Sequence, residues 1–237
     1  MTQWFAHRGV SIIKPENTMA AFRLAEERGA DGIELDVQLT RDNRVVVIHD
    51  LSVNRTTNGR GSIRSKTWED LKKLDAGSWF GGTYEAIPLL EEVTEWLAGN
   101  NLIVNIELKG PLKTMPELIR AVKTIVEPVL PASRVIISSF HHPSVVSLHE
   151  EWEEPEKALL VSSGLYKPLR YLQQADVFSL HVKRQTISDK EIVELMDQGI
   201  IVRVFTVNDE KALQRLVNLQ VDGIMTDHGI LPITLSH

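Results

Sequence analysis

Short apolar runs alternate with amphipathic segments along most of this 237-residue chain. The runs are rich in Val, Ile and Leu, which is typical of buried strands, and the longer segments repeat apolar residues at helical spacing. The predicted strands cover residues 2–6, 32–37, 102–108, 134–139, 158–161, 177–180, 200–206 and 223–226. The predicted helices cover residues 19–28, 89–98, 115–126, 143–151, 168–173, 189–198 and 210–219.

This alternation predicts a parallel sheet covered by helices, and eight such strands predict a closed (β/α)8 TIM barrel. An open, doubly wound sheet is the alternative fold. We expect a single domain over residues 1–237, because no linker or fixed-period repeat divides the chain. Residues 51–88 lack the alternation and scatter glycines and tryptophans among turn residues. They predict an inserted segment with one short helix near residues 68–74.

Two acidic residues interrupt the apolar run at residues 33–37. Successive side chains of a strand point to opposite faces, so Glu34 and Asp36 share one face roughly 7 Å apart. A second apolar run at residues 45–48 follows a turn at residues 40–44, which predicts a hairpin. That hairpin would deliver His49 and Asp50 close to the acids.

A later strand repeats this arrangement with Glu107 and Lys109 on one face. Buried carboxylates need a cation, a basic partner or water. Glu34, Asp36 and Glu107 together predict an oxygen-rich site for a hard divalent cation, Mg²⁺ or Ca²⁺. The alternative is structural, with Glu107 and Lys109 paired to each other or to Arg8.

Two of the eight histidines follow apolar strands directly, namely His7 and His49. In a barrel of parallel strands, residues at the carboxyl ends of the strands face the active site. A neutral and a protonated imidazole can accept and donate a proton, which favours general acid–base cleavage of a phosphodiester. Asp50 could orient the His49 ring, although neighbours on a strand face opposite ways.

Further polar and aromatic residues close other strands. Arg8 and Lys109 have the chemistry to hold phosphate oxygens. His181 ends a later strand, and Phe205 could form part of an apolar wall, although core packing is the alternative for the aromatic residues. We include both as candidate substrate-binding residues.

Composition limits the classes of partner and site. Cysteine is absent, which excludes disulfides, a thiolate nucleophile and a cysteine-based zinc site. The 26 basic and 32 acidic residues give a net charge of −6 without a long run of like charges, so we expect no nucleic acid partner. No segment has the length and pattern of a membrane span or a signal peptide, so we expect a cytoplasmic protein without stable membrane insertion. The sequence does not indicate an oligomeric state.

Nearly the whole chain resembles the glycerophosphodiester phosphodiesterase family, especially its small bacterial cytosolic members. The motifs that carry the resemblance appear in family order: His7-Arg8-Gly9, Pro15-Glu16-Asn17-Thr18, Glu34-Leu35-Asp36-Val37, His49-Asp50, Arg55-Thr56-Thr57, residues 87–93, Glu107-Leu108-Lys109, Thr206-Val207-Asn208 and residues 221–227. Two positions depart from the family pattern. Phe205 stands where many members have tryptophan, and Asp227 is followed by His228-Gly229 where a proline-containing turn is common.

The resemblance implies a TIM barrel that hydrolyses glycerophosphodiesters, such as glycerophosphocholine and glycerophosphoethanolamine, to glycerol 3-phosphate and an alcohol. It implies that the three acids bind the metal, that His7 and His49 are the acid–base pair, and that Arg8 and Lys109 contact phosphate. Three other functions are alternatives to this one. They are a lysophospholipase D acting on an acyl-bearing substrate, a non-catalytic phosphodiester-binding barrel, and a sugar-phosphate isomerase or aldolase for which Lys109 is the obvious candidate.

Overall fold

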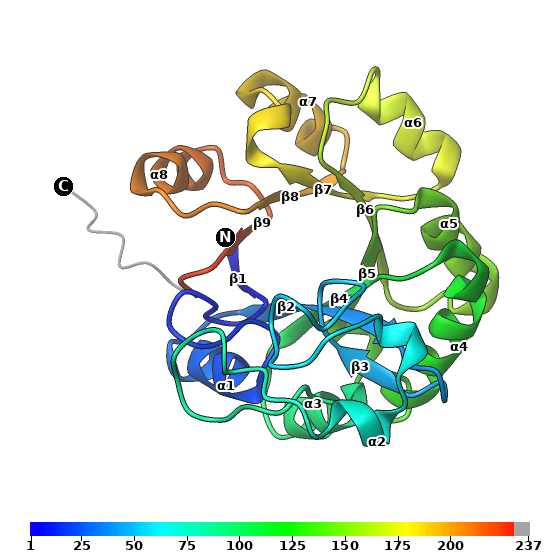
Figure 1. Ribbon diagram of the computed structural model, residues 1–237. Coiled ribbons are helices and arrows are strands. Elements are labelled where there is room, and N and C mark those ends of the chain that lie inside the picture. Colours follow the sequence, from blue (N-terminus) through cyan, green and yellow to red (C-terminus); the bar gives the residue numbers. More distant parts are fainter. Residues whose placement is uncertain (230–237) are drawn as a thin grey trace.

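A closed ring of eight parallel strands forms the centre of the computed structural model, which describes residues 1–229 (Figure 1). The strands of the ring are β1 (Gln3–His7), β2 (Gly32–Leu39), β4 (Ile103–Leu108), β5 (Val135–Ser139), β6 (Glu156–Val161), β7 (Ser179–Lys183), β8 (Ile201–Phe205) and β9 (Gly223–Thr226). Strand β1 pairs with both β2 and β9, which closes the ring. The TIM barrel prediction is therefore confirmed, and the open-sheet alternative is wrong.

Helices surround the ring on its outer side (Figure 1). They are α1 (Met19–Glu27), α3 (Leu90–Ala98), α4 (Met115–Val126), α5 (His142–Glu151), α6 (Pro168–Ala175), α7 (Asp189–Asp197) and α8 (Glu210–Asn218). The main hydrophobic core lies between the outward faces of the strands and these helices. Helix α4 shows the cause, because its buried residues Leu118, Ile119 and Val122 recur at helical spacing.

Local sequence signals account for several boundaries. The Thr18 side chain accepts a hydrogen bond from the backbone N–H of Ala21 and begins α1. Gly29 follows that helix at φ +73°, a left-handed conformation that glycine adopts without strain. Strand β2 continues beyond the ring and pairs in antiparallel fashion with β3 (Val45–Val47), so the predicted hairpin is confirmed.

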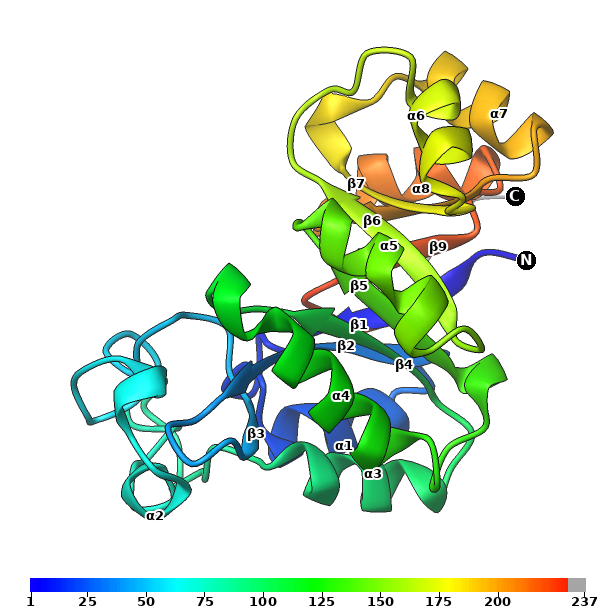
Figure 2. The ribbon, with the colours of Figure 1, turned by 90° about the vertical axis from the view of Figure 1, so that its right-hand side faces the viewer.

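Residues between β3 and α3 leave the ring and form a separate group of loops. Figure 2 shows this cyan segment, with the short helix α2 (Trp68–Leu71), projecting to one side of the molecule. A second small core joins the segment to β3 and to the start of α3. Its buried residues are Val46, Ile48, Val53, Ile63, Leu71, Ala76, Ile87 and Leu89. We call residues 51–88 the insertion.

No helix within residues 1–229 combines the length and apolar character that crossing a bilayer requires.

Candidate active site

Three carboxylates meet inside one end of the ring. Alternation along β2 sends Ile33 and Leu35 outward to the main core and leaves Glu34 and Asp36 facing inward. The register of β2 with β4 sets Glu107 directly opposite Asp36. One oxygen from each acid lies within 4.8 Å of the others, and all three side chains are buried. The predicted convergence of these acids is what the structure shows.

The electrostatics of the three acids suit a cation. Burial and the neighbouring carboxylates raise the pKa of Glu34, and burial with the charge of Asp36 raises the pKa of Glu107 to about 7. Burial on its own would raise the pKa of Asp36 as well, but the positive charges of Arg8 and Lys109 outweigh this effect and lower the pKa of that carboxyl. One oxygen of Asp36, Oδ1, is buried without a hydrogen-bond partner. A hard divalent cation would provide a ligand partner for that oxygen. It would also stabilise the anionic forms of Glu34 and Glu107, which burial makes unfavourable.

Arg8 and Lys109 stand on either side of these acids. The Arg8 guanidinium places Nε 3.2 Å from Asp36 Oδ2. Lys109 Nζ lies 2.5 Å from Glu107 Oε1 and 3.4 Å from Asp36 Oδ1. The pairing that we considered as a structural alternative is therefore present together with the acidic cluster. Both cations keep their charge, because the nearby carboxylates raise the pKa of each against the effect of burial.

His7 is held by a carboxylate from the far end of the chain. Its Nδ1 lies 2.7 Å from Asp227 Oδ1, and its Nε2 lies 3.9 Å from Glu34 Oε2. Ser11 Oγ and Asn208 Nδ2 donate to the two oxygens of Asp227 at 3.1 and 2.5 Å. Asp227 thereby orients the imidazole so that Nε2 points toward the acids.

His49 is held in the same way on the opposite side. Its Nδ1 lies 2.7 Å from Asp50 Oδ1, so Asp50 does orient the ring. Strand β3 ends at Val47, and the alternation that would separate neighbouring side chains no longer applies at residues 49 and 50. Burial lowers the pKa of His49 more than the charge of Asp36 raises it, which favours the neutral imidazole.

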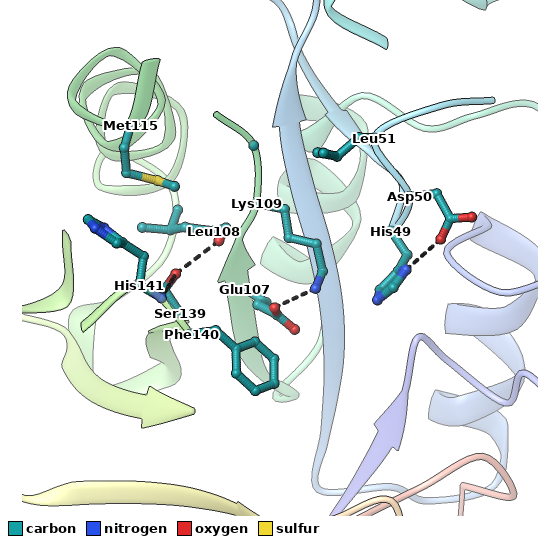
Figure 3. Close-up of a pocket in the computed structure, with 11 residues that line it drawn as sticks. His49, Asp50, Leu51, Glu107, Leu108, Lys109, Met115, Ser139, Phe140 and His141 are labelled. Carbon is teal, nitrogen blue, oxygen red and sulfur yellow. Dashed lines mark hydrogen bonds and ion pairs between the residues drawn. The ribbon is translucent and has the colours of Figure 1, made fainter. Parts of the chain in front are cut away.

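Two hollows open beside the acids. The larger, of about 420 Å³, is lined by His49, Glu107, Lys109, Phe140 and His141 among others (Figure 3). The other, of about 260 Å³, is lined by His7, Arg8, Ser11, Ile12, Glu16 and Asp227. Each histidine thus lines one hollow, and the acidic cluster contributes Glu107 to the larger.

The two remaining candidates occupy different surroundings. Phe205 ends β8 and packs edge-to-face against Phe140 at 6.1 Å between ring centroids, so it supports a wall of the larger hollow. The prediction that His181 lies at the end of a strand is wrong. Strand β7 runs two residues later than expected, so His181 is a fully buried interior residue beside Arg203 and does not reach either hollow.

Sequence reasoning missed several supporting residues. Asn17 donates to Asp36 Oδ2 at 2.8 Å, and Gln38 Nε2 donates to the carbonyl oxygens of residues 48, 49 and 50 at 2.9, 3.0 and 2.7 Å. Asn17 stands out in the sequence only as part of the Pro15-Glu16-Asn17-Thr18 motif, and Gln38 belongs to none of the quoted motifs. For Gln38 a signal existed, because it lies on the inward face of β2 two residues after Asp36 and is itself buried.

Comparison with known proteins identifies the family and several relatives of this chain. The sequence model described as the glycerophosphoryl diester phosphodiesterase family matches residues 7–230. A protein of Bacillus altitudinis named glycerophosphodiester phosphodiesterase is 41% identical over 235 residues, covering 96% of this chain and 95% of that one. A protein of the same name from Caldanaerobacter subterraneus is 41% identical over 228 residues, covering 94% and 92%. The solved structure of an Oleispira antarctica phosphodiesterase in complex with its product sn-glycerol-3-phosphate superposes with a TM-score of 0.92 at 33% identity, covering 97% of this chain and 94% of that one.

Proposed function

This chain belongs to the glycerophosphoryl diester phosphodiesterase family, and from that premise we propose that it hydrolyses glycerophosphocholine, glycerophosphoethanolamine and related diesters. The products are glycerol 3-phosphate and an alcohol. The class of enzyme is set by its relatives, which are named glycerophosphodiester phosphodiesterases. The finer parts of the proposal concern the substrates, the metal and the two histidines.

One observation supports the proposal most directly: two imidazoles, each fixed by a carboxylate, flank a cluster of three buried acids. Glu34, Asp36 and Glu107 would hold a divalent cation, Mg²⁺ or Ca²⁺. When bound, such an ion supplies Lewis-acid stabilisation of the charge on the phosphate. The acid cluster is compatible with either ion, since both prefer oxygen ligands.

The protein's own groups supply positioning and proton transfer. Arg8 and Lys109 bind the phosphate oxygens and keep the diester between the two hollows. One histidine accepts the proton of a glycerol hydroxyl as its oxygen attacks phosphorus, and the other donates a proton to the departing alkoxide. The bond from phosphorus to the alcohol oxygen breaks, leaving a cyclic phosphate. Water then opens the ring to glycerol 3-phosphate, with the roles of the two imidazoles exchanged.

Release of glycerol 3-phosphate from glycerophosphocholine tests the proposal. We expect activity to disappear in EDTA and to return with Mg²⁺ or Ca²⁺. His7→Ala and His49→Ala should each lower kcat at least ~100-fold if the rings transfer protons. His149→Ala is the matched control, because His149 lines a hollow at the starting ends of the strands. Full activity in EDTA would refute the metal role, and full activity of either histidine variant would refute its proton transfer.

A panel of substrates defines the leaving group. Glycerophosphocholine, glycerophosphoethanolamine and lysophosphatidylcholine should be compared under the same metal conditions. Faster turnover of lysophosphatidylcholine would replace the proposal with the lysophospholipase D alternative. The cytoplasmic location and the organisation of residues 1–237 as one catalytic domain stay predictions from the sequence.

A further inference from the structure

An arginine of the insertion joins the two sides of the active site. Arg55 uses Nε and Nη2 on Asp50, at 2.8 and 2.9 Å from Oδ2 and Oδ1. It uses Nη1 and Nη2 on Glu16, at 2.8 Å from each carboxylate oxygen. Both contacts are forked pairs, the geometry in which a guanidinium binds a carboxylate most strongly. We call the unit of Asp50, Arg55 and Glu16 the Arg55 bridge.

Each carboxylate of the Arg55 bridge holds a residue of the proposed reaction with its other contacts. Asp50 binds Nδ1 of His49 at 2.7 Å. Glu16 accepts a hydrogen bond from Nη1 of Arg8 at 3.0 Å. A continuous chain of charge-assisted contacts therefore runs from the imidazole of His49 to the guanidinium of Arg8. These residues come from the end of the hairpin, from the insertion and from the loop after β1.

Ion pairs between exposed side chains contribute little free energy to folding, so partial exposure alone would give the Arg55 bridge only a small stabilising effect. The Arg55 side chain is 43% exposed, and that of Arg44, which makes a single 3.0 Å contact with Glu91, is 44% exposed. The two arginines differ in what they contact. Glu16 is itself largely buried, and the hydrogen bond from Arg55 is the largest influence that lowers the pKa of Asp50. Arg55 is thus the sole side chain among the contacts described for residues 1–229 that holds both carboxylates at once.

We propose that Arg55 is a positioning residue for the reaction: through Asp50 it fixes the His49 ring, and through Glu16 it fixes Arg8. This inference rests on the proposed function. It assigns the insertion a part in assembling the active site. Arg8 keeps its separate contact with Asp36 at 3.2 Å. Loss of Arg55 should therefore disturb the orientation of the His49 ring more than the binding of phosphate by Arg8.

The experiment compares four metal-loaded proteins on glycerophosphocholine: wild type, Arg55→Ala, Arg55→Lys and the control Arg44→Ala. Groups that orient a reacting residue usually contribute about 10–100-fold to activity, and we expect Arg55→Ala to lower kcat by that factor with a much smaller change in KM. Arg55→Lys keeps the charge, but an ammonium cannot present two forks, so its kcat should stay close to that of Arg55→Ala. Arg44→Ala should keep the wild-type kcat.

Two further measurements separate positioning from a general loss of structure. Methylguanidinium at millimolar concentration should restore part of the kcat of Arg55→Ala and leave Arg44→Ala unchanged, because it can occupy the vacated space between the two carboxylates. Adding Arg55→Ala to Asp50→Asn should cost little beyond Asp50→Asn alone, since both changes release the same ring. Thermal unfolding of every variant sets an assay temperature at which all are folded.

Several outcomes would overturn the inference. Wild-type kcat in Arg55→Ala would remove the positioning role, and wild-type kcat in Arg55→Lys would show that charge suffices without the bridge. A loss of kcat without rescue by methylguanidinium and with full additivity to Asp50→Asn would indicate a general structural effect. An inactive wild-type protein would reject the proposed function itself, whereas an active wild type with indifferent Arg55 variants rejects this inference alone.

Discussion

Burial favours the protonated form of the Glu107 carboxyl in the metal-free protein, whereas a bound cation would favour its anion. Burial raises its pKa to about 7 from an ordinary value of 4.5, so the folded chain binds a proton that the unfolded chain releases. Stability from this group is fully present below pH 4.5 and is lost as the pH rises through about 7. A difference of about 2.5 in pKa corresponds to about 3 kcal/mol. Glu34 acts in the same direction, because its pKa is also raised.

We therefore expect ionisation of the Glu107 carboxyl to remove about 3 kcal/mol of unfolding free energy from the metal-free protein between pH 4.5 and pH 8. Glu107→Gln should lose less stability than the wild type over this range, since the amide does not ionise and the other titrating groups are the same in both proteins. Saturating Mg²⁺ should stabilise the wild type more at pH 8 than at pH 5, because the ion replaces protons on the acids. Urea unfolding of dialysed protein at both pH values measures this. An unchanged pH dependence in Glu107→Gln would contradict it.

At the scale of elements, periodicity predicts what a segment is better than where it begins. Helix α4 was predicted over residues 115–126 and has those bounds, because its apolar residues recur over three turns. Strand β7 was predicted over residues 177–180 but spans Ser179–Lys183. Val177 is apolar because it packs in the main core, yet its N–H bonds to the carbonyl of Leu172 at the end of α6. An apolar run in the sequence indicates burial, whereas the first residue of a strand is set by its hydrogen bonding to the neighbouring strands.

The convergence of the three acids was predictable because each carboxylate interrupts an apolar strand, which is a local signal. Asp50 could be considered for the orientation of His49 because it is the next residue, but Asp227 and Arg55 carried no such signal. His7 and Asp227 are separated by 220 positions and meet only because β9 closes the ring against β1. Arg55 lies in a segment whose pattern predicts loops, and its partners come from two other parts of the chain. Contacts of this kind depend on the closed fold and cannot be inferred from spacing.

The insertion should affect activity as an element, through the small core that holds it under β3. Leu71 on α2 is fully buried in that core, and Leu172 on α6 is equally buried in the main core. Either leucine-to-alanine change should cost about 2–5 kcal/mol. We expect only Leu71→Ala to lower kcat at a temperature where both variants are folded, because it loosens the segment that carries Arg55. Limited proteolysis within residues 51–88 should accelerate in that variant, and equal kcat in the two variants would contradict this expectation.

For the whole molecule, the parallel arrangement of the strands separates two polar ends. His7, Glu107 and Phe205 stand at or next to the last positions of their strands and belong to the candidate active site. Gln3, Glu156 and Ser179 are the first residues of β1, β6 and β7, and the guanidinium of Arg203 reaches all three across the interior. Arg203 also lies over the ring of Phe5, with 5.3 Å between the guanidinium carbon and the ring centroid. The starting ends of three strands are thus tied to the middle of β8 by one buried cation.

Removing either member of the pair between Arg203 and Glu156 should change stability and leave the reaction intact. The Arg203 side chain is 5% exposed and that of Glu156 is 26% exposed, so the two changes are not equivalent. Glu156→Gln leaves a buried guanidinium without its anion and should cost about 3–5 kcal/mol. Arg203→Met leaves a carboxylate that can still reach water and places an apolar side chain beside Phe5, so it should cost less. Urea unfolding measures both costs, and kcat with its Mg²⁺ dependence should match wild type in each variant. A loss of kcat comparable to that of His49→Ala would mean that the two ends of the barrel are coupled, contrary to the separation that the parallel strands impose.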